Sequence, residues 1–580
     1  MMKRIIQSAL AMAIGLSSME SMAAADLILH NGKVFTAEQG KALQQAVAVQ
    51  DGKVVRVGSD AEVLALKDPG TQVVDLQGKV LMPGLIDTHS HAVFGGIKLK
   101  SADLETQMLP FDELEQRLRE WRDNGKARHG DILLVGGTPS TYWSQVPEFE
   151  KRFNQGEWAD TPILFAGWDY HTGWANRALL KRAGIDAERV KALTGEAVAT
   201  IGHHDDNTPN GFVADAGLSA VMSQLPPASL EQLIGAAEAA RDLYHSLGVT
   251  ALMDPAANAV PGDSLFDFKP TVKNVGVLPA YKALADKGEL RLHVAALMVV
   301  NPKSKPADLE VMAQVREQFA DVDNLTLPGI KVFADGVAEF PAQTASLLSP
   351  YKNSLKGGEL LIDPAHFGEL VGAADARGWL VHVHAIGDRA VRESLNGIEQ
   401  ARREGHNNVA HSITHLQMVN PKEFTRFKPL NVIASMQLYW ATADELSIDL
   451  LQPYINAMQF QFMYPARSLL KNGATISGAS DWPVSTPDPW KAIGQAISRK
   501  GPKGVLNQAE AIDRETMFYA YTRNAAKTIG LEQQIGSLTP GKQADMIVVD
   551  RDVFSAPESE LADTQVLKTW FAGREVYSRP

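Results

Sequence analysis

Short apolar runs alternate with amphipathic segments through most of this chain. The stretch 231–247 is an amphipathic example, with apolar residues at helical spacing. Such alternation favours an α/β protein with a parallel sheet, and eight apolar runs suffice to close that sheet into a (β/α)8 TIM-like barrel. We expect the barrel strands at residues 85–91, 249–254, 291–298, 329–335, 380–385, 412–416, 431–436 and 475–480.

The spacing of these predicted strands is uneven at one place. Residues 92–248 separate the first strand from the second, which is far more than one connecting helix needs. We therefore expect an inserted lobe at about residues 105–228, after barrel strand 1. Because the loops after the strands form the active-site face of such a barrel, the lobe is expected to overhang that face.

Both ends of the chain consist of short apolar strands separated by turn residues. Near the start, Asn31-Gly32 and Asp51-Gly52 are dipeptides typical of two-residue hairpins. Short apolar strands of the same kind recur at residues 546–549 and 566–576. We expect the two ends to pair, so that residues 26–82 and 531–580 form one small domain beside a barrel of residues 83–530. Asp545 is expected to have a structural role in a turn.

The first 25 residues differ from the rest. Lys3 and Arg4 precede an apolar stretch at 5–16, and Ser21-Met-Ala23 or Ala23-Ala-Ala25 supplies the small residues that a signal peptidase needs. This pattern predicts a Sec-type signal peptide over residues 1–25 and a periplasmic or secreted mature protein. The apolar stretch is shorter than the roughly 20 residues of a membrane span, so no membrane insertion is expected after cleavage.

Composition narrows the classes of function. The net charge of −12 argues against nucleic acid or an anionic membrane surface as a partner. The chain contains no cysteine, which excludes disulfides, thiolate metal sites and a cysteine nucleophile and fits an oxidising compartment. The expected partners are a small-molecule substrate and, as one option, a second copy of the chain in a homodimer.

Residues 83–94, Pro-Gly-Leu-Ile-Asp-Thr-His-Ser-His-Ala-Val-Phe, carry the clearest candidate chemistry. An apolar run leads into His89 and His91, and residues two apart in an extended strand project to the same face. Two imidazoles at the end of a buried strand suit a divalent ion such as zinc. Two unrelated loop histidines are the alternative interpretation.

This block resembles the opening of the metal site in the amidohydrolase superfamily. Three further blocks resemble its branch of N-substituted formamide deformylases and YtcJ-like hydrolases, within amidohydrolase family 3. They are Val-His-Ala-Ile-Gly-Asp-Arg-Ala at 383–390, Gly-Ala-Ser-Asp-Trp-Pro-Val at 478–484 and Ala-Tyr-Thr-Arg-Asn-Ala-Ala at 520–526. The resemblance extends over nearly the whole chain after the first two dozen residues.

The resemblance implies a β-sandwich built from both chain ends and a metal site built from strand ends. It implies that Lys331 reacts with CO2 to become a carbamate that bridges two ions; a lysine that reaches solvent or pairs with Asp335 is the alternative. The ligand types favour zinc, with one or two ions per chain. The implied ligands are His89, His91, Lys331, His384, His415 and Asp481.

Other residues are candidates for substrate contact. The lobe contains aromatic residues and a segment at 168–176 that resembles a block of the YtcJ-like branch, although a packed lobe core explains them equally well. His382 precedes His384 by two residues, so it is expected to support the ligands or touch substrate. After strand seven, aromatic residues replace the branch's usual pocket histidine. The candidates are Trp143, Asp169, His171, Trp174, His382, Tyr439 and Trp440.

These features together favour a metal-dependent hydrolase of an amide or related C–N bond other than a peptide bond, of the N-substituted formamide deformylase type. In the expected reaction a bound metal would activate water, and Asp481 would accept its proton and return it to the leaving amine. A hydrolase of another bond, such as a dipeptidase, lactonase or cyclic amidase, is a second interpretation. A small-molecule-binding regulator related to exoenzyme regulatory proteins is a third, but such a protein has no need for a proton-accepting Asp481.

Overall fold

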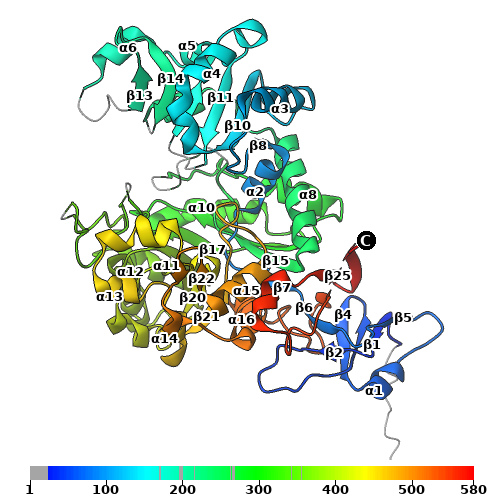
Figure 1. Ribbon diagram of the computed structural model, residues 1–580. Helices are drawn as coiled ribbons and strands as arrows, with labels where there is room; N and C mark the ends of the chain where they lie inside the picture. Colours follow the sequence, from blue (N-terminus) through cyan, green and yellow to red (C-terminus); the bar gives the residue numbers. More distant parts are fainter. Residues whose placement is uncertain are drawn as a thin grey trace, which may run out of the picture.

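The computed structural model describes residues 24–168, 172–194, 200–214, 216–260, 263, 265, 268–340, 343–354 and 356–580. A barrel lies at the centre, with the lobe on one side and a β-rich domain on the other (Figure 1). The predicted signal peptide falls almost entirely outside the described residues and stays a prediction. No helix in the described part is both long enough and apolar enough to span a membrane.

A parallel barrel forms the body of the molecule, and within the described residues it has eight strands in the order β21-β20-β19-β18-β17-β16-β15-β7. The first and last strands are joined by a hydrogen bond from Thr88 N to Gly478 O, 3.1 Å long. Every predicted strand overlaps an observed one, so the predicted barrel is confirmed. The strands are β7 (Leu85–Asp87), β15 (Val249–Asp254), β16 (His293–Val299), β17 (Leu325–Phe333), β18 (Leu380–Ala385), β19 (His411–His415), β20 (Val432–Met436) and β21 (Thr475–Gly478).

The first barrel strand is shorter than predicted. It ends at Asp87, and His91 already precedes the first residue of helix α2 (Ala92–Lys100). The expectation that His89 and His91 share a face through strand alternation is therefore wrong. Their common direction comes instead from a parallel bridge between Ser90 and Trp482, which fastens this segment to the one that follows β21.

Helices cover the outside of the barrel. The predicted helix at 231–247 is α8 (Leu230–Ser246), which begins with a capping box between Ser229 and Gln232. It packs against α2, where Gly96 permits a close approach because a Cβ there would lie 2.0 Å from Ala236 O. The others are α9 (Leu278–Asp286), α10 (Leu309–Gln318), α11 (Phe367–Ala376), α12 (Asp388–Arg403), α13 (Ala457–Gln461), α14 (Ala466–Lys471), α15 (Pro489–Ser498), α16 (Arg514–Ala520) and α17 (Arg523–Thr528).

The N-terminal end of the barrel is sealed by apolar packing. Ala525 and Ala526 of α17 belong to one buried cluster with Ile86, Met253 and Leu297 from the barrel strands. The backbone N–H of Ile86 also donates to the carbonyl of Tyr521 over 2.8 Å. The motif at 520–526 is thus a plug for the end of the barrel opposite the strand ends that carry the predicted ligands.

The inserted lobe has its own sheet and core. Its strands are ordered β13-β14-β12-β11-β10-β8, with β9 added beside β10. Aromatic side chains pack in its interior, among them Phe149, Phe153, Trp158, Phe165 and Trp174. The elements are β8 (Ala102–Asp103), α3 (Phe111–Asp123), β9 (Arg128–His129), β10 (Ile132–Thr138), α4 (Val146–Phe153), β11 (Ile163–Gly167), β12 (Thr172–Ala175), α5 (Arg177–Arg182), α6 (Ala187–Ala192), β13 (Ile201–His203), β14 (Pro209–Ala214) and α7 (Ala216–Met222).

Both chain ends contribute to the β-rich domain, which has two sheets ordered β4-β3-β1-β5 and β2-β6-β24-β25-β26 in the described chain. Asp51 and Gly52, both at positive φ, form the predicted hairpin turn between β3 and β4. Asn31-Gly32 is not a hairpin, because the chain crosses there from one sheet to the other. The elements are β1 (Leu27–His30), β2 (Lys33–Val34), β3 (Ala46–Gln50), β4 (Lys53–Gly58), α1 (Asp60–Leu64), β5 (Gln72–Asp75), β6 (Val80–Pro83), β24 (Met546–Val549), β25 (Val566–Phe571) and β26 (Arg574–Ser578).

One buried polar pair fastens this domain to the base of the barrel. His293, the first residue of β16, places Nε2 2.9 Å from Oδ2 of Asp545. The other carboxylate oxygen of Asp545 accepts a hydrogen bond from Ala572 N over 2.8 Å. Both contacts give Asp545 the structural role that its place before the last strands predicts.

Candidate metal centre

All six predicted ligands lie at the C-terminal ends of barrel strands. His89 and His91 follow β7, Asp481 follows β21, and the other three lie on β17, β18 and β19. Five of the six are buried; His91 is half-buried. The order of the strands therefore brings residues from both halves of the chain to one end of the barrel, as the sequence motifs indicate.

Asp481 is the centre of this cluster. Its Oδ1 lies 3.4 Å from Nε2 of His89 and 3.5 Å from Nε2 of His91. The backbone fixes this meeting, because Asp481 N donates to His89 O over 2.7 Å and His91 N donates to Trp482 O over 2.8 Å. Asp481 itself has a φ of 57°, a left-handed conformation that is uncommon outside glycine and concentrates at functional sites.

His415 completes the tightest part of the cluster. Ligand atoms of His89, His415 and Asp481 lie within 4.8 Å of one another. The ring of His384 lies beside that of His415, with 4.4 Å between centroids. Like Asp481, His415 has a positive φ, here 75°. His411, the other histidine of β19, lies at the start of the strand near Asp375 in α11, away from the cluster.

Hydrogen bonds assign the ligand atom of two histidines. Nε2 of His384 donates to the carbonyl of Gly336 over 3.0 Å, so Nδ1 is its lone-pair nitrogen. Nδ1 of His415 donates to Oε1 of Gln437 over 3.1 Å, so Nε2 is its lone-pair nitrogen. The amide of Gln437 is oriented in turn by its bond to Thr414 Oγ1. Outer partners of this kind hold metal-binding imidazoles in one tautomer and orientation.

Lys331 is a buried amine without a hydrogen-bond partner among the described residues. Its Nζ lies 5.0 Å from the centroid of the Phe333 ring. Burial lowers the pKa of this amine to about 7, against a smaller opposing effect of Asp481. The alternative partner, Asp335, is engaged elsewhere, because it accepts hydrogen bonds from Ser346 N, Ile386 N and Gly387 N.

The donor set fits a divalent cation. Burial lowers the pKa of His89, His91, His384 and His415, so all four imidazoles are neutral, the form that coordinates metal. Asp481 adds a carboxylate.

Asp87 braces the two segments that carry ligands, although the sequence motifs did not single it out as a site residue. Its carboxylate accepts hydrogen bonds from Ser480 N, Ser480 Oγ and His89 N, at 3.0, 2.5 and 3.2 Å. Tyr244 of α8 donates to it as well, over 3.2 Å. Burial raises the pKa of Asp87 to about 6. The only sequence signal for this role is its place inside the motif at 83–94.

Aromatic rings stand against three of the ligands. Trp440 lies parallel to His415, with 5.5 Å between centroids and 8° between planes. Phe94 stacks on His91 at 5.7 Å, and Phe333 lies 5.1 Å from His384. Tyr439, beside Trp440, is 38% exposed. Of the two aromatic candidates after strand seven, Trp440 therefore lies against a ligand.

The other substrate-contact candidates are placed differently. His382 is completely buried, beneath the ligands rather than in a pocket. Trp174 is also completely buried, within the lobe core, and Trp143 packs against that core with its Nε1 bonded to Thr172. These placements favour the packed-core alternative for both tryptophans. Asp169 and His171 lie outside the described residues.

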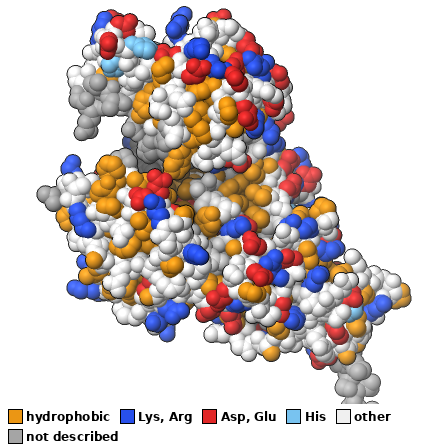
Figure 2. Space-filling model, viewed as in Figure 1, with side chains coloured by type: hydrophobic (Ala, Val, Ile, Leu, Met, Phe, Trp, Pro, Cys, Tyr) orange, Lys and Arg blue, Asp and Glu red, His pale blue; other side chains and the backbone are white. Residues whose placement is uncertain are grey.

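The surface is hollowed between the lobe and the barrel, with hydrophobic side chains gathered along the junction (Figure 2). Trp168, on the lobe, is 44% exposed.

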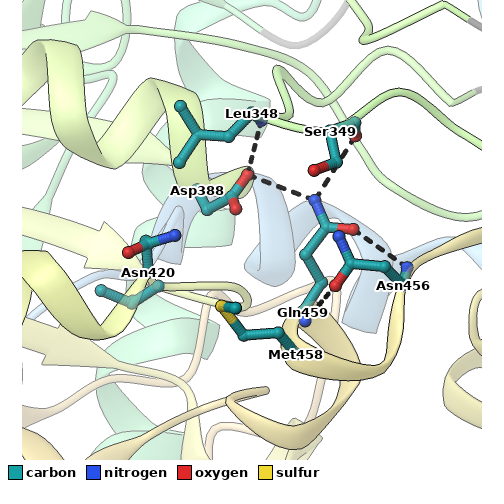
Figure 3. Close-up of a pocket in the computed structure, with 8 residues that line it drawn as sticks. Leu348, Ser349, Asp388, Asn420, Asn456, Met458 and Gln459 are labelled. Carbon is teal, nitrogen blue, oxygen red and sulfur yellow. Dashed lines mark hydrogen bonds between the residues drawn. The ribbon is translucent and has the colours of Figure 1, made fainter.

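A separate pocket lies beside α12, and none of the six ligands is among the described residues that line it (Figure 3). Its volume is about 90 Å³. Its Asp388 accepts hydrogen bonds from Leu348 N and Gln459 Nε2 at one carboxylate oxygen.

Comparison with known proteins places these features in a family. The family model described as "Amidohydrolase family" matches residues 72–577, which is most of the chain. Protein LONG AFTER FAR-RED 3 of Arabidopsis thaliana is 27% identical over 95% of this chain and 92% of its own length. The YtcJ protein of Bacillus subtilis is 25% identical, over 95% and 99%. The N-substituted formamide deformylase of Arthrobacter pascens is 23% identical, over 96% and 98%.

A solved structure shares the fold. It is an uncharacterized metal-dependent hydrolase from Pyrococcus horikoshii OT3, 23% identical, which superposes with a TM-score of 0.69 over 92% of this chain and 99% of its own. The match extends beyond the barrel, because nearly all of both chains is covered. The inserted lobe and the two-ended β-rich domain are thus part of a shared architecture.

Proposed function

The chain belongs to the amidohydrolase family, and on that premise we propose that it is a metal-dependent hydrolase of an amide or related C–N bond other than a peptide bond. The observation that carries the proposal is the meeting of His89, His415 and Asp481 within 4.8 Å at the active-site end of the barrel. The likeness to an N-substituted formamide deformylase supports the choice of bond.

The ligands divide into two groups. His89, His91 and Asp481 meet at one carboxylate oxygen, and His384 lies beside His415, which links the two groups because its ligand atom is within 4.8 Å of those of His89 and Asp481. Carboxylated Lys331 would lie near both groups, since the charge of its amine acts on all four imidazoles. Nitrogen and oxygen ligands of this kind suit zinc. A divalent ion bound here would lower the pKa of water from 15.7 to about 7 and polarise a carbonyl oxygen.

Asp481 is the proposed proton acceptor. Its carboxylate borders the position that two imidazoles define, and a carboxylate there can take a proton from the attacking water. The same group can then deliver that proton to the nitrogen of the leaving amine. The backbone bond to His89 and the left-handed φ hold this side chain in place before substrate arrives.

Lys331 is proposed to be carboxylated. The neutral amine attacks the carbon of CO2, a new N–C bond forms, one C=O electron pair moves to oxygen, and the nitrogen gives one proton to water. The product is a carbamate with one negative charge. Burial favours this reaction because it keeps a large fraction of the amine neutral near pH 7.

The walls of the site favour an uncharged substrate with an apolar substituent. Trp440 and Phe94 present rings beside the ligands. The two aromatic rings offer an apolar substituent a better surface than a substrate carboxylate, which disfavours N-acyl amino acids and dipeptides.

A matched pair of formamides tests this proposal. N-pentylformamide and N-formylnorleucine share the formamide and the alkyl chain and differ by one carboxylate. We expect zinc-loaded protein to release formate from the first at least tenfold faster, and a chelator to abolish the reaction reversibly. Preference for the charged compound would contradict the apolar site. Hydrolysis of lactones or dipeptides alone would favour another bond, and zinc binding without any hydrolysis would favour a regulator.

We also propose that the mature protein acts outside the cytoplasm, because of the charged and apolar pattern at residues 1–25. The N-terminal sequence of the protein recovered from a periplasmic fraction checks this. A start near residue 24 or 26 is expected, and an intact Met1 in the cytoplasm would contradict it.

A further inference from the structure

His382 forms the centre of a buried polar chain beneath the metal centre. Its Nε2 lies 2.7 Å from Nδ1 of His89, and its Nδ1 lies 2.6 Å from Oγ of Ser412. His382 and Ser412 are paired in register on β18 and β19. None of the three side chains is more than 2% exposed, so solvent cannot replace these hydrogen bonds.

The donor-to-acceptor direction of these hydrogen bonds follows from the protonation state that His89 needs at Nε2. Nε2 of His89 faces Asp481 and has to be unprotonated to hold a cation. The proton of a neutral His89 is then on Nδ1, which donates to Nε2 of His382. His382 must in turn carry its own proton on Nδ1, which donates to Ser412 Oγ. One arrangement of protons thus satisfies all four ring nitrogens.

We propose that His382, which is hydrogen-bonded to Ser412, is a positioning residue that fixes the tautomer and the ring plane of His89. This inference rests on the proposed metal site. His384 and His415 have their own acceptors, the carbonyl of Gly336 and the amide of Gln437. His89 uses an imidazole for the same purpose. Because His382 is completely buried, it cannot touch substrate, and its contribution to the reaction passes through His89.

A purely structural role makes a different prediction. If His382 only filled space, then any neighbour of similar burial would matter as much for metal binding. Val383 is that neighbour: it is completely buried on the same strand, but its side chain belongs to the hydrophobic core outside the barrel. Val383→Ala therefore removes packing from β18 without touching the His89–His382–Ser412 chain.

The test measures the zinc dissociation constant by competition with a chelating indicator, together with the melting temperature of the metal-free protein. We expect His382→Ala to weaken zinc binding about 10- to 100-fold, the usual loss for an outer partner of a ligand. His382→Gln is expected to restore most of the affinity, because its amide oxygen can accept from His89. Val383→Ala is expected to lower the melting temperature and leave the dissociation constant unchanged.

Three results would overturn the inference: equal zinc affinity in His382→Ala and wild type, equal losses in His382→Ala and Val383→Ala, or a His382→Gln variant as weak as His382→Ala. If the alanine variant does not fold, Ser412→Ala replaces it and must still weaken zinc more than Val383→Ala does. If the wild type takes up no zinc, the proposed function has failed. Crystal structures then decide the inference: the His89 ring rotates in His382→Ala and not in His382→Gln, and an unrotated ring contradicts it.

Discussion

The Oδ1 atom of Asp481 lies 3.4 Å from Nε2 of His89, although the two residues follow the last and first strands of the barrel. Their backbones are bonded as well, from Asp481 N to His89 O. The contact that closes the barrel therefore also assembles the site. The backbone hydrogen bond between these two segments places the Asp481 carboxylate against the imidazoles.

Replacement of Asp481 by Asn tests its role as proton acceptor. The amide keeps the size of the side chain but cannot take a proton from water, so kcat is expected to fall by about 10²- to 10⁴-fold. The measurement is formate release from N-pentylformamide at saturating zinc. Asp488→Asn is the matched control, since Asp488 caps α15 and Asn caps helices equally well. Full activity of Asp481→Asn with zinc bound would refute the assignment.

Lys331 predicts a pH dependence of stability in metal-free protein kept free of CO2. Its pKa is about 7 in the folded state and 10.5 without burial, so between these values the unfolded chain binds one more proton. The free energy of unfolding should then rise with pH in this window, by up to about 1.4 kcal/mol per unit. Lys331→Met removes the titrating group. Denaturant titrations at pH 7 and 9 should show the extra rise in wild type; identical slopes contradict a buried neutral amine.

Trp440 is expected to act on substrate affinity. Trp440→Ala removes the ring that stacks on His415, so KM for N-pentylformamide should rise about tenfold or more, as for loss of a large apolar contact. Trp440→Phe keeps an aromatic wall and should retain most of the affinity. Steady-state kinetics of the three proteins separate the effects. A loss confined to kcat in Trp440→Ala would show that the ring serves His415 and not the substrate.

The His293–Asp545 pair should matter for stability alone. It joins β16 to the β-rich domain at the end of the barrel away from the metal centre. Asp545→Ala leaves His293 without its buried partner and is expected to cost about 1–3 kcal/mol of unfolding free energy. Thermal unfolding should shift downwards while kcat stays at the wild-type value. A large fall in kcat with no loss of stability would give this pair a role in the reaction.

The sequence predicts the barrel well because periodicity and strand length are local properties. The runs at 249–254 and 380–385 match β15 and β18 residue for residue. It predicts the end of β7 poorly, because the chain after Asp87 is held by a bridge to Trp482, far away in sequence. The Asn31-Gly32 turn fails for a similar reason: tertiary pairing with β6 directs the next strand into the other sheet.

The sequence motifs identify the candidate metal ligands. They do not identify the residues that hydrogen-bond to those ligands and orient them. Gln437 and Ser412 show no local signal, since each acts only through a neighbouring strand that brings a histidine beside it. The aromatic residues of the lobe show the opposite problem, because the sequence offers them as candidates for substrate contact although they pack in the lobe core. Trp174 lies in a motif-like segment but packs against Phe149, and a large aromatic residue has the same sequence signature in a core as in a pocket.

The metal content of the mature protein, purified without chelator, tests the central claim most directly. Elemental analysis per chain is the measurement, with His89→Ala/Asp481→Asn as the matched site variant. We predict two divalent ions per wild-type chain, zinc foremost, and loss of metal from the variant. No metal in the wild type, together with refusal to bind added zinc or manganese, would contradict the assignment of this site as the catalytic centre of a metal-dependent hydrolase.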